Sequence, residues 1–312
     1  MAKITLAIHG GSGTILKENM TAEIEAAYRK GLEEALAAGF NELEKNNSAI
    51  SAVKAAVISL EDNILFNAGR GSVFTKNGIH EMDAAIIDGK TLSAGAVASV
   101  HNIKNPVELA EKVMNNSEHI LLCGEGADDF AKQMNLKTEP DEYFFSQFRY
   151  DQWQKIKSKN TSALDHDILL SENKFGTVGA VACDVNGNIA AATSTGGMTN
   201  KEFGRIGDSP LIGIGTYANN RTCAVSCTGH GEPFIKAVAA YDVSCLIEYK
   251  GLSLEEAMRK VIMDKLVKID GDGGMIGVDA KGNAAMIFNS TGMYRAMKNS
   301  EGLQTIAIYR DE

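Results

Sequence analysis

The sequence is poor in proline, has no long hydrophobic run and carries no excess of positive charge. Only 4 of its 312 residues are proline, whereas 31 are glycine. This balance favours tight turns and close backbone packing and argues against a disordered linker protein. No run of about 18 apolar residues occurs, so no membrane span is expected. The net charge of −9 disfavours nucleic acid and anionic membranes as partners, although a local arginine can still bind a small anion.

The cysteines also exclude a disulfide framework. Their number is odd, and the first residues, Met1 to Ile8, read directly into a strand without the hydrophobic region of a signal peptide. We therefore expect reduced thiols and a cytoplasmic location. Cys223 and Cys227 are four positions apart, whereas metal-ligand pairs usually follow a Cys-x-x-Cys spacing, so buried core thiols are favoured over metal ligands. The five cysteines are Cys123, Cys183, Cys223, Cys227 and Cys245.

Several common site motifs are missing. There is no Gly-x-Ser-x-Gly of a serine hydrolase, no dinucleotide-binding Gly-x-Gly-x-x-Gly and no phosphate-binding Gly-x-x-x-x-Gly-Lys-Ser/Thr. The segment His80 to Ala84 begins like the helix of a zinc protease but lacks the second histidine.

The first half of the chain contains mainly helical patterns after one strand. Residues 3–8 alternate polar and apolar side chains and predict a strand that stops at the glycine-rich segment 9–13. The apolar spacing then predicts a helix from Thr21 to about Gly39 and a second helix over 50–60. A third helix is predicted to start at Pro106, after Asn105, and a fourth to cover about 125–134.

The second half contains mainly hairpin patterns. Residues 155–174 are polar without an apolar period, which predicts a mobile linker or a polar surface helix and turn. Asn-Gly and related turns then predict three hairpins with two helices before the last hairpin. Composition is ordinary, with 44% hydrophobic and 23% charged residues, and favours an α+β fold of two antiparallel sheets with helices outside. The predicted hairpins span 176–195, 212–227 and 274–289, and the helices span 232–249 and 254–269.

Thr177 is the candidate with the most specific chemistry. It follows Gly176 where the predicted linker meets a buried strand. A threonine hydroxyl is a weak nucleophile, but an N-terminal threonine carries a base in its own α-amino group, whose pKa is about 7.7–8. Cleavage between Gly176 and Thr177 would create that base, and Gly176 tolerates the strained backbone that the cleavage requires. On spacing alone, a strand threonine after a turn glycine is the alternative.

Several ordered blocks resemble the plant-type L-asparaginase/isoaspartyl peptidase family of Ntn-hydrolases. The resemblance runs from about residue 4 to past residue 290, and the predicted linker is its least certain part. The blocks are IHGG at 8–11, LFNAGRGSVFT at 65–75, HEMDAAIIDG at 80–89, GTVGAVACDVNGNIAAATSTGGMTNKEFGRIGDSPLIGIGTYANN at 176–220 and AVSCTGHGE at 224–232. Such blocks at compatible spacing are far more specific than one short motif.

The resemblance implies an Ntn-hydrolase αββα sandwich, in which two antiparallel sheets lie between helical layers. Residues 1–312 would form one domain that cuts itself before Thr177, giving an α subunit of residues 1–176, with the linker at about 155–174, and a β subunit of residues 177–312. Thr177 would be the nucleophile. Thr195 would polarise or position it, and strand-end packing is the alternative role of Thr195. Thr228 and Gly229 would form the oxyanion pair, a hydroxyl and a backbone N–H.

The resemblance also implies substrate-binding roles for Arg205 and Asp208. A β-aspartyl substrate leaves its α-carboxylate and α-ammonium free. Arg205 can bind the carboxylate through two parallel hydrogen bonds, and Asp208 can bind the ammonium. Gly229 would assist in binding. A surface ion pair between Arg205 and Asp208 is the alternative, and such a pair would contribute under about 1 kcal/mol.

Further roles implied by the resemblance concern self-cleavage and a cation. Asn67 would lie near the cleavage junction. His9-Gly10-Gly11 would shape the floor of the site, and His230 would modify specificity without being a catalyst. No cofactor is expected for catalysis. A structural sodium ion would be held by backbone carbonyls of the loop over 60–70, although hydrogen bonds alone are the alternative way to hold this loop. The carbonyls belong to Leu60, Glu61, Asn63, Phe66, Ala68 and Arg70.

The expected activity is hydrolysis of isoaspartyl dipeptides and L-asparagine with release of L-aspartate. The expected partner is this small-molecule substrate, without nucleic acid or membrane, and the expected assembly is a homodimer of cleaved α/β units. A glycosylasparaginase or a threonine endopeptidase of the same fold is the alternative enzyme. A non-catalytic aspartate-binding protein, uncleaved, is the alternative outside enzymes.

Overall fold

The computed structural model describes residues 2–46, 48–158 and 176–312. Within this part of the chain, the strands form an eight-stranded and a four-stranded sheet. The large sheet has the order β12 (Gln304–Tyr309), β11 (Gly292–Asn299), β1 (Thr5–Gly13), β5 (Val178–Cys183), β6 (Ile189–Thr195), β2 (Met82–Asp88), β3 (Ala94–Val100) and β4 (Leu121–Cys123). The small sheet has the order β10 (Ala284–Phe288), β9 (Gly273–Val278), β8 (Ala224–Gly229) and β7 (Thr216–Ala218).

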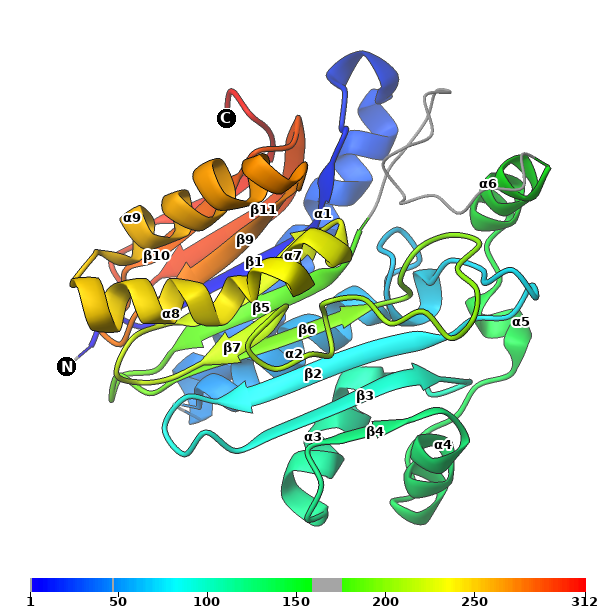
Figure 1. Ribbon diagram of the computed structural model, residues 1–312, viewed down its shortest axis with the longest axis horizontal. Coiled ribbons are helices and arrows are strands. Elements are labelled where there is room, and N and C mark those ends of the chain that lie inside the picture. The colour runs from blue at the N-terminus through cyan, green and yellow to red at the C-terminus, as the bar shows by residue number, and fades with distance from the viewer. Residues whose placement is uncertain (1, 47, 159–175) are drawn as a thin grey trace.

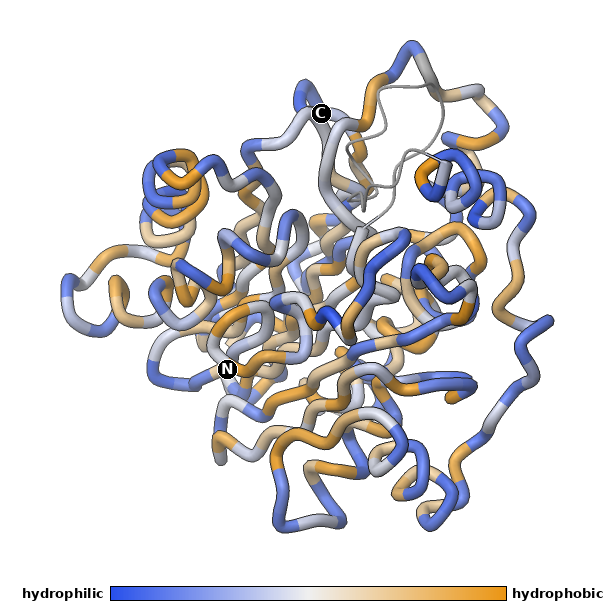
Figure 2. The backbone as a smooth tube through the Cα atoms, turned by 45° about the vertical axis from the view of Figure 1, so that its right-hand side comes forward, coloured by the Kyte–Doolittle hydropathy of each residue, from blue (hydrophilic) through white to orange (hydrophobic). Residues whose placement is uncertain are grey.

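Helices cover the outer face of each sheet, as Figure 1 shows. The helices α1 (Ala22–Asn46), α2 (Ala49–Glu61) and α3 (Pro106–Asn116) share one apolar core with the large sheet. The helices α7 (Gly231–Ala237), α8 (Ala239–Lys250) and α9 (Leu254–Arg259) share another core with the small sheet. A third apolar cluster joins strands of the two sheets. The layers are therefore helices, sheet, sheet and helices. Figure 2 shows the hydrophobic stretches gathered toward the centre.

The central strands have small side chains. Every residue of β5 and β6 is buried, and most are alanine, glycine, valine or threonine. A strand that is covered on both faces requires such a continuous run of compact side chains. The register of β5 and β6 pairs Val178 with Ser194, so Thr177, just before β5, lies close to Thr195, at the end of β6. Gly229, at the end of β8, lines the same pocket as Thr177 and Thr195.

Several predictions about the elements are confirmed. The helices α2, α3 and α4 (Gly124–Gln133) lie where they were predicted, and Ser48 caps α2 by accepting a hydrogen bond from the backbone N–H of Ser51. The three hairpins are present as β5–β6, β7–β8 and β9–β10. The predicted helix over 254–269 is a continuous helical segment that passes from α9 into a π-helix, η3 (Lys260–Leu266), and a 3-10 turn, η4 (Val267–Ile269).

Other predicted boundaries are wrong. The strand β1 continues through the glycines to Gly13, with a bulge between His9 and Gly11. The helix α1 passes Gly39 because this glycine serves close packing: a Cβ there would lie 2.7 Å from the carbonyl oxygen of Ala52 in α2. The predicted helix over 232–249 is divided into α7 and α8 at Val238, whose φ is 49°.

The order of elements also differs from the prediction of helices first and strands later. Strands β2, β3, β4, β11 and β12 were not expected, and β3 pairs with β4 in parallel, so the large sheet is not wholly antiparallel. The segment His80 to Ala84 runs into β2 and is not a helix, which removes the zinc-protease interpretation. After α5 (Asp141–Phe144), the helix α6 (Gln147–Lys157) includes the first residues of the predicted linker at 155–174. The other linker residues lie outside the described residues, apart from Ser158.

Candidate active site

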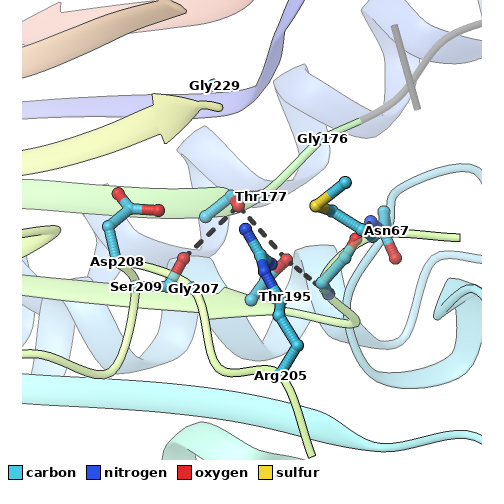
Figure 3. Close-up of a pocket in the computed structure, with 11 residues that line it drawn as sticks. Asn67, Gly176, Thr177, Thr195, Arg205, Gly207, Asp208, Ser209 and Gly229 are labelled. Carbon is cyan, nitrogen blue, oxygen red and sulfur yellow. Dashed lines mark hydrogen bonds between the residues drawn. The ribbon is translucent and has the colours of Figure 1, made fainter. Parts of the chain in front are cut away.

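Thr177 lies at the edge of a pocket that the ends of β5, β6 and β8 form together (Figure 3). Thr177 is 8% exposed. The Thr177 hydroxyl donates a hydrogen bond to the Thr195 hydroxyl over 3.2 Å, and the backbone N–H of Gly197 donates to the same Thr195 oxygen over 3.0 Å. Thr195 is therefore held in place by its own loop. The pairing of β5 with β6 brings these two predicted residues together, so strand-end packing is not the only contact that Thr195 makes.

Ser209 is a further hydroxyl beside Thr177. The Ser209 Oγ lies 3.4 Å from the Thr177 Oγ1, and Ser209 lines the pocket. Sequence reasoning did not single out Ser209, although it follows Asp208 directly. The position of Ser209 next to Asp208, a predicted binding residue, was the available signal. The direction of the Ser209 side chain, however, depends on the loop that brings residues 207–209 to β5.

Gly176 packs against the bulge of β1. A Cβ added to Gly11, whose φ is +116°, would lie 2.5 Å from the backbone nitrogen of Gly176 and 3.0 Å from its carbonyl oxygen. Gly11 therefore permits a backbone contact that any side chain would block. The His9-Gly10-Gly11 segment thus lies beside the Gly176–Thr177 junction, where the resemblance placed it.

Arg205 reaches the pocket, but its ion-pair partner is not Asp208. The guanidinium donates from Nε to Glu232 Oε1 over 2.9 Å and from Nη2 to Glu232 Oε2 over 2.8 Å. His230 Nε2 lies 3.0 Å from Glu232 Oε2. His230 is half-buried, and its contact with the Glu232 carboxylate raises its pKa. Glu232 therefore orients the arginine, and His230 meets the pocket only through Glu232.

Asp208 is buried, and its carboxylate lacks a full set of partners. Among the described residues, no group hydrogen-bonds to its Oδ2 atom. Burial raises the pKa of Asp208 to about 7. A buried, incompletely paired carboxylate in a pocket is a candidate partner for a cation. The alternative of a surface Arg205–Asp208 ion pair is not what the structure contains, because Asp208 is 3% exposed and Arg205 binds Glu232.

Of the expected oxyanion pair, Gly229 is among the residues that line the pocket and Thr228 is not. Gly229, whose φ is +142°, lines the pocket. Thr228 is buried beside it, but its Oγ1 accepts a hydrogen bond from the backbone N–H of Ser12 over 3.2 Å, and Thr228 is not among the lining residues. Its oxyanion role stays a prediction. The residues that line the pocket are Asn67, Gly176, Thr177, Thr195, Gly197, Met198, Arg205, Gly207, Asp208, Ser209 and Gly229.

Asn67 fixes the loop that follows β6. Its Nδ2 donates to the carbonyl oxygen of Gly197 over 2.8 Å, and its Oδ1 accepts from the backbone N–H of Val73 over 3.1 Å. The backbone N–H of Gly196 donates to the Asn67 carbonyl oxygen over 3.0 Å. Asn67 shares the pocket wall with Gly176 and Thr177. It therefore lies in the same pocket as the junction, as expected, although its bonds go to the Gly196–Gly197 turn.

Backbone carbonyl oxygens lie close to the two glycines of the loop after α2. A Cβ added to Gly71 would lie 2.0 Å from the Phe66 oxygen and 2.7 Å from the Ile64 oxygen, and one added to Gly69 would lie 2.6 Å from the Glu61 oxygen. These donors suit a hard cation such as sodium. Backbone N–H groups also bind the carbonyls of four of the predicted ligands, which are Leu60, Asn63, Phe66 and Ala68. Each carbonyl has a second lone pair, so the prediction and its alternative both stand.

The buried thiols are not arranged as a metal site. Burial raises the pKa of Cys223 to about 12 and that of Cys227 well above its usual range. All five cysteines are free thiols. Across residues 2–46, 48–158 and 176–312, histidine, cysteine and acidic side chains form no group that could hold a metal ion.

In the same part of the chain, no helix has the length and apolarity that a bilayer crossing requires.

Comparison with known proteins identifies related chains over the whole length. The model of the family Asparaginase_2, described as asparaginase, matches residues 2–308. The chain is 48% identical to the isoaspartyl peptidase of Escherichia coli (strain K12), with 100% of this chain and 98% of the relative aligned. It is 49% identical to the isoaspartyl peptidase of Salmonella typhimurium, with 100% of both aligned. It is 41% identical to the isoaspartyl peptidase/L-asparaginase of Xenopus laevis, with 99% and 96% aligned.

Proposed function

Because the chain belongs to the asparaginase family, we propose that it is an isoaspartyl peptidase and L-asparaginase, which hydrolyses the β-amide bond of isoaspartyl dipeptides and of L-asparagine. One observation carries the proposal most directly. The Thr177 hydroxyl, with Thr195 and Ser209 beside it, shares a pocket with the Arg205 guanidinium and the buried Asp208 carboxylate. A β-aspartyl group needs this combination of a nucleophile, a carboxylate partner and an ammonium partner.

The proposed activation is cleavage of the Gly176–Thr177 peptide bond. The Thr177 hydroxyl attacks the Gly176 carbonyl carbon, the peptide nitrogen is displaced and takes up a proton, and water hydrolyses the resulting ester. The products are a Gly176 carboxylate and a free Thr177 α-amino group. That amine serves as the base for every later turnover, since its ordinary pKa of about 7.7–8 leaves a neutral fraction near pH 7. Residues 1–176 and 177–312 become the α and β subunits of one Ntn-hydrolase αββα domain.

Hydrolysis then follows acyl transfer. Arg205 binds the α-carboxylate and Asp208 the α-ammonium, which places the β-carbonyl at Thr177. The amine accepts the Thr177 proton as the hydroxyl attacks and returns it to the departing amine or ammonia. The Gly229 N–H and the Thr228 hydroxyl stabilise the oxyanion, each by about 3–4 kcal/mol. Water hydrolyses the aspartyl ester and releases L-aspartate. No cofactor takes part.

The remaining parts of the proposal concern assembly and setting. Carbonyls of the 60–70 loop would hold a sodium ion, which would stiffen the turn that carries Asn67. The cleaved units would pair as a homodimer. A cytoplasmic location is consistent with five free thiols, because reducing compartments maintain them.

The test is a time course of the purified protein. Gel electrophoresis should show two fragments, and N-terminal sequencing should give threonine, then Val178, as the new terminus. The Thr177→Ala variant should stay intact and inactive. Full activity in an uncut wild-type chain would overturn the proposal. Parallel assays with L-asparagine, an isoaspartyl dipeptide and a glycosylated asparagine then establish which substrate class the pocket accepts.

A further inference from the structure

His9 joins the two sheets directly behind Thr177. It lies in β1 and is completely buried. Its Nδ1 is 3.0 Å from the carbonyl oxygen of Thr177 and its Nε2 is 2.8 Å from the Ser226 Oγ in β8. Gly179 makes this bridge sterically feasible. A Cβ on Gly179 would lie 2.0 Å from the Ser226 Oγ and 2.5 Å from the His9 Nε2. The imidazole therefore occupies a site that the neighbouring backbone leaves open for it.

The two contacts determine where the imidazole carries its proton. A carbonyl oxygen only accepts, so the hydrogen is on Nδ1 and is donated to Thr177. Burial lowers the pKa of His9 to about 3, and the ring is therefore neutral at physiological pH. The Nε2 atom then has a lone pair, and the Ser226 hydroxyl donates to it. A neutral imidazole is a very weak acid, so His9 is not suited to act as a general acid at neutral pH.

Further hydroxyls extend this arrangement away from His9. The Ser226 Oγ lies 2.7 Å from the Thr193 Oγ1, which lies 2.6 Å from the Thr216 Oγ1. Each hydroxyl has one proton, and that of Ser226 is given to His9. Thr193 therefore donates to Ser226, and Thr216 donates to Thr193.

The chain of hydroxyls returns to the nucleophile. The Thr216 Oγ1 is also 2.9 Å from the carbonyl oxygen of Ser209, so its one proton is shared between this oxygen and the Thr193 hydroxyl. The Ser209 Oγ in turn lies 3.4 Å from the Thr177 Oγ1. Thr193, Ser209, Thr216 and Ser226 are all buried. The network thus begins at the carbonyl of Thr177 and ends beside its hydroxyl.

We propose that His9 is a positioning residue, which fixes the carbonyl group of Thr177 and so aims its amine and hydroxyl at the substrate. The inference rests on the proposed role of Thr177. After cleavage, Thr177 is attached to the chain only through its carbonyl carbon. Rotation of the Thr177–Val178 peptide group about the N–Cα bond of Val178 would swing the carbonyl, the amine and the hydroxyl of Thr177 together, and the hydrogen bond from His9 to the carbonyl oxygen opposes this rotation. Before cleavage, Gly176 anchors the other side. His9 is therefore needed more for turnover than for self-cleavage.

The experiment compares His9→Ala with His9→Asn in the full-length chain, with wild type alongside. The Asn amide N–H can replace the Nδ1 donor, whereas Ala has no donor. We expect His9→Ala to lower kcat by about ten- to a hundredfold, the usual effect of losing one buried hydrogen bond at a reacting group. KM should change less than about threefold. His9→Asn should recover most of kcat. Self-cleavage of both variants should remain within about threefold of wild type.

The pH profile and a stability control complete the test. Because His9 is neutral, the acid limb of the kcat profile should have the same midpoint in wild type and His9→Asn. Val225→Ala, a cavity variant in β8 on the other side of the small sheet, should lower the melting temperature without lowering kcat.

The results separate this inference from the proposed function. A wild-type protein that never forms fragments contradicts the function of Thr177 itself. An active wild type together with an equally active His9→Ala overturns only the role of His9. Equal losses in His9→Ala and His9→Asn, or a proportional loss of self-cleavage, would show a structural effect and overturn it as well.

Discussion

The two walls of the pocket are built from different chemistry. One wall carries the neutral hydroxyls of Thr177, Thr195 and Ser209, which are buried and hydrogen-bonded to one another. The other wall carries charged groups, of which Arg205 is paired with Glu232 and Asp208 is buried. Hydroxyls can be buried at low cost when they satisfy each other, whereas charges require partners or water. In the proposed mechanism, reaction chemistry and substrate recognition therefore fall to different residues of one small space.

The difference supports the proposal that the base is generated by cleavage. Among the described residues, the Thr177 hydroxyl contacts the hydroxyls of Thr195 and Ser209, and neither of these hydroxyls is basic. The charged wall contains carboxylates, of which Glu232 orients Arg205 and Asp208 is proposed to bind the substrate ammonium. In the proposed mechanism, the amine released by cleavage supplies the missing base.

Removing a hydroxyl from the neutral wall should have the largest effect. Thr195→Ala should lower kcat by about a hundred- to a thousandfold, the range for losing a donor that acts on developing charge. KM should change little, because Thr195 does not touch the expected positions of the substrate charges. Thr195→Ser is the matched control and should retain most activity. The measurement is steady-state hydrolysis of an isoaspartyl dipeptide by fully cleaved protein. A rise in KM with kcat unchanged would show that Thr195 acts in substrate binding, with the charged wall.

Removing the cation of the charged wall should affect binding and spare cleavage. Arg205→Ala should lower kcat/KM by about a hundredfold, mainly through KM, because two charge-assisted hydrogen bonds to the substrate carboxylate are lost. Fragments should still form at close to the wild-type rate, since Gly176 offers no carboxylate to Arg205 in the uncut chain. Arg205→Lys should keep part of the binding. Equal damage to cleavage and hydrolysis would contradict the separation of the two walls.

The slope of log kcat/KM against pH should show whether Asp208, in the charged wall, titrates in addition to the Thr177 amine. Burial raises the pKa of Asp208 to about 7, so its charge is lost as the pH falls below 7. The Thr177 amine, with an ordinary pKa of about 7.7–8, is also protonated at low pH. With L-asparagine, log kcat/KM should therefore approach a slope of 2 on the acid side. In Asp208→Asn the slope should be 1, and kcat/KM near pH 8 should be about tenfold lower. An unchanged slope would remove Asp208 from ammonium binding.

The smallest expected effect comes from the residue that orients Arg205. Glu232→Gln keeps an acceptor for the Arg205 Nε–H but loses the charge-assisted pairing over both oxygens. We expect KM to rise about two- to fivefold with kcat unchanged. His230→Gln serves as a comparison, because His230 contacts Glu232 Oε2, the oxygen that also accepts from the Arg205 Nη2. A change in kcat comparable to that of Thr195→Ala would show that Glu232 acts on the neutral wall.

The sequence predicted those turns and helix starts that depend on neighbouring residues, and it missed features that depend on contacts with distant segments. Asn186-Gly187 predicted the turn between β5 and β6, and Pro106 predicted the start of α3. Gly39 was misread as a helix end because its reason for being glycine lies in another helix. The break at Val238 was missed because a β-branched residue with a positive φ carries no sequence signal. Strands β11 and β12 also went unpredicted.

For the site, the sequence by itself determined Thr177 after Gly176 and, through its resemblance to a known family, the roles expected of Thr195, Arg205 and Asp208. Only the tertiary structure decided that Ser209 lies beside the nucleophile, that Arg205 pairs with Glu232 and that His9 holds the Thr177 carbonyl. These contacts join residues from 27 to 168 positions apart. A linear pattern records which side chains are present, whereas their directions are set by strand register and sheet packing, which arise only when distant segments pack together.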